Sequence, residues 1–162
     1  MKKFAVALVL CVITLTPLVS SARGVENKKF GVGVNVGEPF GVNSRYFFTD
    51  QFVGDLTVGF GYVGERSFVV QPTGLFYLRH ILTLDDDNFS LVPYFGLGFK
   101  TGVDTWTPSN QFIAAMRVPL GVAFVVKEVV FEITGEYATG FRFNPNAGYD
   151  YTGGIGLRFY FM

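Results

Sequence analysis

The sequence is poor in cysteine, in histidine and in charge. Its 162 residues include one cysteine, one histidine and only 16% charged residues. The cysteine, Cys11, lies in an N-terminal apolar run, so the chain after residue 22 can form no disulfide. Beyond that run, no stretch approaches the roughly 20 consecutive apolar residues that a membrane-spanning helix needs. These absences exclude a disulfide-stabilised domain and a helical membrane protein.

The shortage of charge also argues against an ordinary water-soluble domain. A soluble surface is typically about 25–35% charged, whereas this chain combines 16% charge with 17% aromatic residues and 20 glycines. Without Lys2 and Lys3, the chain keeps 11 Lys and Arg against 13 Asp and Glu, a net charge of about −2. That balance lacks the basic footprint of a nucleic-acid binder, so we expect no nucleic-acid partner.

The N-terminus has the order of features found in a secretory signal. Lys2 and Lys3 precede an apolar run from Phe4 to Leu18, and small residues follow at Ser20 and Ala22. The apolar core of about 15 residues is shorter than a spanning anchor. Lipidation at Cys11 is disfavoured because a large residue precedes it. We therefore predict a signal peptide at residues 1–22, with a single domain over residues 23–162.

Alternation of large apolar residues with small or polar ones predicts eight strands in this domain. It is clearest at the C-terminus, where Ile155, Leu157, Phe159 and Phe161 alternate with glycine and Arg158. The predicted strands cover residues 30–37, 42–48, 55–62, 68–80, 91–100, 111–125, 131–137 and 153–161. Loops are expected at Thr101–Asn110 and Gly140–Tyr149. Eight strands of about 9–11 residues use roughly 80 residues, which fits a small barrel.

The fold class predicted is all-β, an eight-stranded antiparallel up-and-down transmembrane β-barrel. Its bulky face would face lipid, because the other face carries mostly glycine, threonine and asparagine, which suit a crowded lumen. A soluble lipocalin-like barrel would instead show a charged exterior. An even strand number would place both termini on the periplasmic side. Pro72 and Pro119 lack a ladder donor and are expected to mark bulges or ladder breaks.

Charged residues recur on the face assigned to the lumen. The residues predicted to form a lumen charge network are Arg45, Asp55, Arg79, Lys100, Arg117, Glu132, Glu136 and Arg158. Pairing is expected because isolated charges in a narrow lumen are costly. Such a network can form a salt-bridged plug or line a narrow, gated pore for ions or small solutes. Eight strands leave little open lumen, which favours the plug.

Catalytic, metal-binding and cofactor-binding motifs are not found. His80 is the only histidine, and neither G-x-S-x-G nor H-E-x-x-H occurs. The run Asp85–Asp87 lacks the spacing of a calcium-binding loop and is expected to be a solvated turn. We therefore expect no enzyme activity, no metal and no cofactor. An outer-membrane lipid-modifying enzyme is the least favoured alternative.

Three segments carry a family resemblance: Gly31–Tyr46, Arg117–Gly121 and Gly153–Phe161. They resemble small eight-stranded bacterial outer-membrane barrels of the OmpA and OmpX type, including a family of unassigned function. The resemblance covers nearly all of residues 29–161 and implies residence in outer-membrane lipid, with the C-terminal strand read by the barrel-assembly machinery. Met162 departs from the pattern, because such proteins commonly end on an aromatic residue. On this basis we expect a monomeric structural or interaction protein with surface loops available to external partners. Trp106, in one of these loops, has two roles open to it: contact with such a partner, or anchoring of the barrel at the membrane–water interface.

Overall fold

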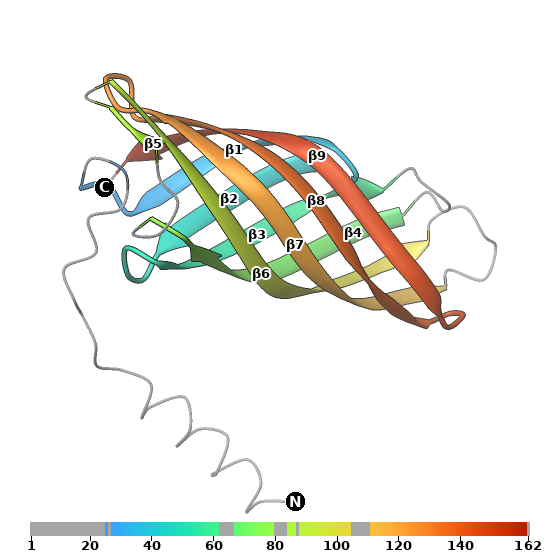
Figure 1. Ribbon diagram of the computed structural model, residues 1–162. Helices are drawn as coiled ribbons and strands as arrows, with labels where there is room; N and C mark the ends of the chain where they lie inside the picture. Colours follow the sequence, from blue (N-terminus) through green and yellow to red (C-terminus); the bar gives the residue numbers. More distant parts are fainter. Residues whose placement is uncertain are drawn as a thin grey trace, which may run out of the picture.

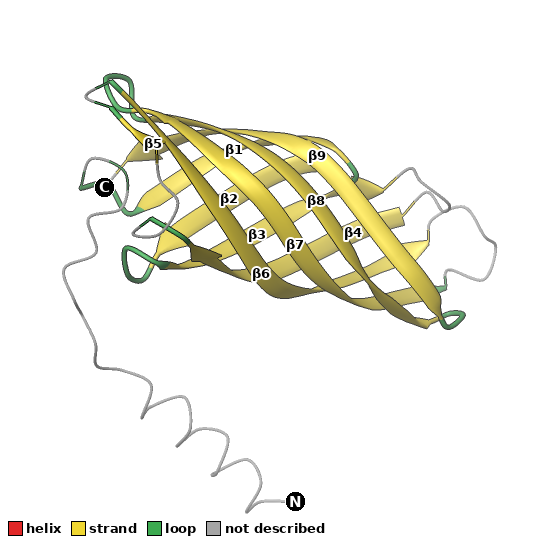
Figure 2. Cartoon of the chain, in the orientation of Figure 1, coloured by secondary structure: helices red, strands yellow, loops and turns green. Residues whose placement is uncertain are grey.

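The strands of the described residues form one curved antiparallel sheet, in which each strand pairs with at least one strand next to it in the sequence (Figures 1 and 2). The computed structural model describes residues 25, 27–61, 67–79, 84–86, 88–104 and 111–161. The predicted signal peptide at residues 1–22, His80 and Trp106 lie outside these residues. The strands of the described part are β1 (Phe30–Gly37), β2 (Phe40–Phe47), β3 (Phe52–Gly61), β4 (Ser67–Tyr77), β5 (Leu84–Asp85), β6 (Phe89–Asp104), β7 (Phe112–Val126), β8 (Phe131–Asn144) and β9 (Gly148–Phe161).

The sheet closes on itself. Its order is β4-β3-β2-β1-β9-β8-β7-β6-β5, and an additional pairing of β4 with β6 joins the two sides. The N-terminal strand β1 pairs with the C-terminal strand β9 over its whole length, from Phe30↔Phe161 to Gly37↔Gly154. The two-residue β5 pairs only with the start of β6. The predicted closed eight-stranded antiparallel up-and-down barrel is therefore confirmed, with β5 as a small addition to one hairpin.

Several predicted boundaries are wrong, chiefly because the later strands are longer than expected. The segment Gly140–Tyr149 was expected to be a loop, but β8 runs to Asn144 and β9 begins at Gly148. The expected loop Thr101–Asn110 begins inside β6, which ends at Asp104. β6 has 16 residues, whereas β1 has 8. The polar residues and glycines of these segments form backbone pairs with the neighbouring strands. Their loop-like composition therefore led to strand ends that were predicted too early or too late.

Two prolines interrupt the ladder without changing its register. Between β4 and β6, pairing stops after Val70↔Thr101 and resumes at Thr73↔Gly98, with Pro72 in the gap. Between β6 and β7 it stops at Phe95↔Leu120 and resumes at Gly98↔Arg117, with Pro119 in the gap. In each case one missing N–H donor accounts for the interruption. The ladder breaks predicted at Pro72 and Pro119 are confirmed.

The two faces of the barrel wall differ sharply in chemistry. On β9, Ile155, Phe159 and Phe161 are 54%, 58% and 43% exposed, whereas Arg158 and Tyr160 are almost fully buried in the lumen. The same alternation puts Leu75 and Tyr77 of β4 inside, as the sequence predicted. Bulky apolar side chains therefore cover the outside, and polar or charged side chains occupy much of the inside. In the described residues no helix is long and apolar enough to span a membrane.

The end of the lumen near the two termini is filled by apolar and aromatic side chains. Phe47, Val53 and Leu75 lie there with the rings of Tyr77 and Tyr94, which stack with their centroids 5.1 Å apart. Val25, ahead of β1, is buried among them. Because side chains alternate along each strand, several strands direct one or two apolar or aromatic side chains into this end of the lumen. The charged groups lie further along the lumen, beyond this apolar layer.

Candidate functional site: the charged lumen

A four-member cluster of charges lies at the centre of the lumen. The guanidinium of Arg45 on β2 donates to Asp55 on β3 at 2.7 Å and to Glu132 on β8 at 2.9 Å. Arg158 on β9 also donates to Glu132 and lies 3.8 Å from Asp55. All four side chains are at most 9% exposed. Two cations and two anions from four strands are thus joined into one neutral group.

Neutral polar side chains complete this central cluster. Asn43 donates to Asp55 and to Thr57, each at 2.8 Å, and accepts a hydrogen bond from Arg158. The hydroxyl of Tyr77 donates to Glu132 at 3.3 Å and accepts from Arg45. These bonds satisfy the remaining polar atoms of the carboxylates, as a buried ionic group requires.

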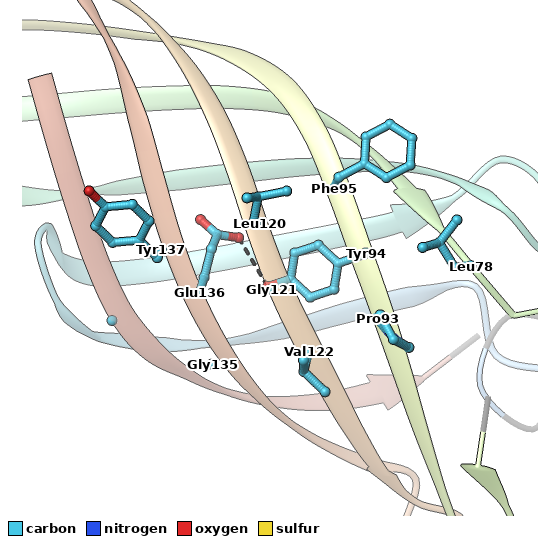
Figure 3. Close-up of a pocket in the computed structure, with 11 residues that line it drawn as sticks. Leu78, Pro93, Tyr94, Phe95, Leu120, Gly121, Val122, Gly135, Glu136 and Tyr137 are labelled. Carbon is cyan, nitrogen blue, oxygen red and sulfur yellow. Dashed lines mark hydrogen bonds between the residues drawn. The ribbon is translucent and has the colours of Figure 1, made fainter. Parts of the chain in front are cut away.

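A second pair lies beside this cluster. Arg117 on β7 donates to Glu136 on β8 at 2.6 Å and also to the side-chain oxygen of Gln71 on β4. The hydroxyl of Tyr94 on β6 donates to the same carboxylate at 3.0 Å, as Figure 3 shows. Tyr94 fits there because Gly121 lies over its ring: a Cβ at position 121 would come within 2.4 Å of that ring. The glycine therefore allows an aromatic group to cross from β6 to β8.

A third pair, Lys100 on β6 with Asp150 on β9, lies towards the opposite end of the lumen from the termini. Their side chains meet at 3.1 Å and are 8% and 12% exposed. The sequence prediction included Lys100 but missed Asp150, because it ended the last loop at Tyr149 and began the strand at Gly153. Asp150 shares the inward phase of Thr152, Gly154 and Arg158, so extending the alternation backwards along β9 would have found it.

Arg79, the remaining predicted member, lies just beyond the end of β4. Its guanidinium carbon lies 5.0 Å from the ring centre of Phe47 and 5.8 Å from that of Tyr77. The structure therefore places Arg79 against the aromatic layer at the terminal end of the barrel. Seven of the eight predicted residues lie in the three charged groups, and Arg79 lies outside them.

The lumen keeps a small polar cavity between the second pair and the β1–β2 turn. Asn35, Glu38, Gln71, Arg117 and Glu136 are among its lining residues, and its volume is about 10 Å³, enough for about one water molecule. Within the described chain, the side-chain nitrogen Nε2 of Gln71 and the Nε of Arg117 have no hydrogen-bond partner. Both donors are buried, which suits ordered water in this cavity.

The charged groups do not form a recognisable metal site. Across the residues that the structure describes, no group of three or more His, Cys, Asp or Glu side chains is arranged to hold a metal ion. Each acidic residue of the three groups already accepts from an arginine or a lysine. What this arrangement does chemically is to neutralise and fill the lumen and to tie β2, β3, β6, β7, β8 and β9 together across it.

Comparison with known proteins gives a likeness of fold. No protein-family model matches the chain, and no curated protein matches it in sequence. The crystal structure of the N-terminal β-barrel domain of Pseudomonas aeruginosa OprF superposes with a TM-score of 0.60. The match has 13% sequence identity and covers 83% of this chain and 98% of that one. The chain therefore has the eight-stranded barrel fold of the OprF N-terminal domain.

Proposed function

We propose that the protein is a monomeric outer-membrane β-barrel of bacteria whose charged lumen acts as a structural plug. The observation that carries this is the pairing of Arg45 and Arg158 with Asp55 and Glu132, which joins four strands through the centre of the barrel. An apolar layer at the terminal end of the lumen adds a second obstruction. Such a lumen favours rigidity over passage of solutes.

The outside of the barrel supports placement in lipid. Large apolar side chains are exposed on every barrel strand, including Phe60, Leu97, Leu120 and Ile155, each more than half exposed. Monomeric soluble proteins rarely expose contiguous apolar surface on this scale. A closed barrel also leaves no sheet edge across most of its height, which a membrane-embedded sheet requires. The fold of the OprF barrel domain supports the same placement.

An interaction role is supported by the β8–β9 hairpin, which extends beyond the β1–β2 turn (Figure 1). The pairing of β1 with β9 ends at Gly37↔Gly154, and just after β1 the N–H of Glu38 donates to the carbonyl of Gly153. Tyr149 and Tyr151, further along β9, are 86% and 61% exposed and have no β1 partner within the described residues. Exposed tyrosines beside an uncovered strand edge offer a surface for an external partner. At the other end of β9, Phe161 is the residue we propose for recognition by the assembly machinery.

Two measurements test this proposal. The protein, extracted in detergent, should change electrophoretic mobility when boiled, because a folded membrane barrel resists the denaturing detergent until heated. In a planar bilayer it should give no defined conductance steps. A chain that stays soluble without detergent and shows no mobility change would reject the membrane placement. Defined steps would reject the plug while leaving the membrane placement intact.

A narrow channel is the second candidate, and the polar cavity beside Arg117 and Glu136 favours it. Arg117 and Glu136 both line this cavity, so separation of this one pair would enlarge it. If wild-type protein conducts, Glu136→Gln should change the conductance or the ion selectivity. Glu128→Gln, at an exposed position in the β7–β8 turn, is the matched control. If the two substitutions change the conductance equally, the Arg117–Glu136 pair does not control the passage of ions.

A further inference from the structure

A shallow trough crosses the outside of the barrel wall over β6, β7 and β8. Its floor is the row of paired residues Pro93, Val122 and Gly135, which the sheet register places side by side. The hollow has a volume of about 730 Å³, and its lining is almost entirely apolar. Leu78, whose N–H donates to the carbonyl of Pro93, lies at one end, and Gly154 of β9 lies at the other, next to Ile155, which pairs with Gly135.

Rows of larger side chains bound this floor. The row on one side is Phe95, Leu120 and Tyr137, whose exposed fractions are 44%, 55% and 57%. Figure 3 shows these three side chains with Pro93 and Val122 over their strands. The register places Leu91, Phe124 and Ile133 in the row on the other side. Proline, valine and glycine therefore form the row between two rows of larger side chains, and the row of Phe95, Leu120 and Tyr137 lines the hollow.

Gly135 leaves the part of the trough floor on β8 without a side chain. It faces outward, between Ile133 and Tyr137 of the same strand, and a Cβ at this position would meet no atom within 4 Å. Most other glycines of the barrel lie close to backbone or ring atoms, for example Gly140, where a Cβ would lie 1.8 Å from the carbonyl oxygen of Met116. Close packing does not explain the glycine at position 135. An occupant from outside the chain would.

We propose that the trough binds one acyl chain of a membrane phospholipid, and this inference rests on the placement of the barrel in the outer membrane. Three strand spacings of about 4.8 Å separate Pro93 from Ile155, so the trough is about 14 Å long. The row runs across strands that tilt about 35–45° from the barrel axis, so the trough is inclined to the membrane normal and spans part of the depth of one leaflet. The apolar lining suits a hydrocarbon chain, and neighbouring charged groups such as Glu136 are directed into the lumen.

The position of the trough selects the leaflet. Val122 is four residues from the end of β7, and Gly135 is four residues after the start of β8. Both of these ends lie on the side of the barrel where β1 begins and β9 ends, because Phe131 pairs with Phe159 and Phe30 with Phe161. With the termini on the periplasmic side, this is the half of the wall in contact with the periplasmic leaflet. The lipid is therefore a phospholipid of that leaflet rather than the lipopolysaccharide of the opposite one.

The test is retention of phospholipid by the whole chain. Protein reconstituted in bilayers of palmitoyl-oleoyl phosphatidylethanolamine and phosphatidylglycerol is diluted into mild detergent and weighed by native mass spectrometry. Wild type should retain one phospholipid per chain. Gly135→Leu fills the floor at a position where an added Cβ meets no atom within 4 Å, so its retained fraction should fall about tenfold or more. Thr139→Leu, an exposed outward position on the same strand but outside the trough, should retain lipid like the wild type.

Controls separate failure of this inference from failure of the proposed function. Heat-dependent mobility is measured for each variant, and Gly135→Ala replaces Gly135→Leu if the latter does not fold. Wild-type protein that folds and inserts but retains no more phospholipid than Gly135→Leu would overturn the trough site alone. Preferential retention of lipopolysaccharide, added in a parallel reconstitution, would overturn the assignment to phospholipid. Absence of insertion would instead reject the membrane placement.

Discussion

Arg45 and Glu132 are 87 positions apart in the sequence, yet the guanidinium of one donates to the carboxylate of the other at 2.9 Å. They lie on β2 and β8, which are not neighbours in the sheet, so their bond crosses the lumen. Glu132 also accepts from Arg158 and from Tyr77. The carboxylate of Glu132 is thus the point where three strands besides its own are joined inside the barrel.

Loss of the Glu132 charge should strongly destabilise the barrel. Glu132→Gln leaves Arg45 and Arg158 with Asp55 as their one remaining carboxylate, and removing one partner of a buried ion pair costs about 3–5 kcal/mol. Urea unfolding in detergent micelles measures the free energy of unfolding. Glu128→Gln, exposed in the preceding β7–β8 turn, should change it by less than about 0.5 kcal/mol. Similar values for the two variants would contradict a structural role for the central cluster.

The Lys100–Asp150 pair should show strong coupling in a double-mutant cycle. Lys100→Met or Asp150→Leu alone leaves one buried charge without its partner, whereas the double variant removes both charges and should be closer to wild type in stability. The coupling free energy should be on the order of 1–3 kcal/mol and is measured from unfolding of the four proteins. Additive effects of the two substitutions would mean that the pair contributes no interaction energy.

Two glycines of β8 should respond oppositely to alanine. Gly140→Ala places a methyl group against the carbonyl oxygen of Met116 on β7, so the strands must shift, at a cost of about 1–3 kcal/mol. Gly135→Ala adds the same methyl group where no atom lies within 4 Å, and should be neutral or slightly stabilising. Thermal unfolding in detergent compares the two. Equal losses would show that strand conformation, rather than close approach, determines both effects.

A charged side chain on the outer face should make membrane insertion less favourable, and the cost should be larger the nearer the charge lies to the middle of the membrane. Leu120→Arg puts a guanidinium near the middle of the apolar wall and should cost about 2–4 kcal/mol of insertion free energy. Phe143→Arg, near the end of the β8–β9 hairpin, should cost about 0–1 kcal/mol. Unfolding of protein refolded into phospholipid vesicles measures both. If Leu120→Arg leaves the free energy of insertion unchanged, the outer face of the barrel at Leu120 is exposed to water rather than to lipid.

The alternation of side chains allowed much of this fold to be predicted. Because successive strand residues face opposite sides, the outward positions of Ile155 and Phe159 and the inward position of Arg158 followed from their spacing. The same rule correctly put Leu75 and Tyr77 inside. It failed at the ends of the strands, where Gly140 and Arg142 belong to β8 despite a loop-like composition. There the partner strand, through its hydrogen bonds, decides whether a residue is extended.

The sequence by itself determined which face of each strand a residue occupies, and hence that charges gather inside a barrel with an apolar exterior. The tertiary structure decided which charges meet. Closure of β1 on β9 and the register of each pair fix the height of every side chain in the lumen, so Arg45 lies within reach of Glu132, and Lys100 of an unpredicted Asp150. The trough beside Gly135 has the same origin, since only the register aligns Pro93, Val122 and Gly135 in one row. Alternation is local to one strand, whereas register depends on strands far apart in the chain.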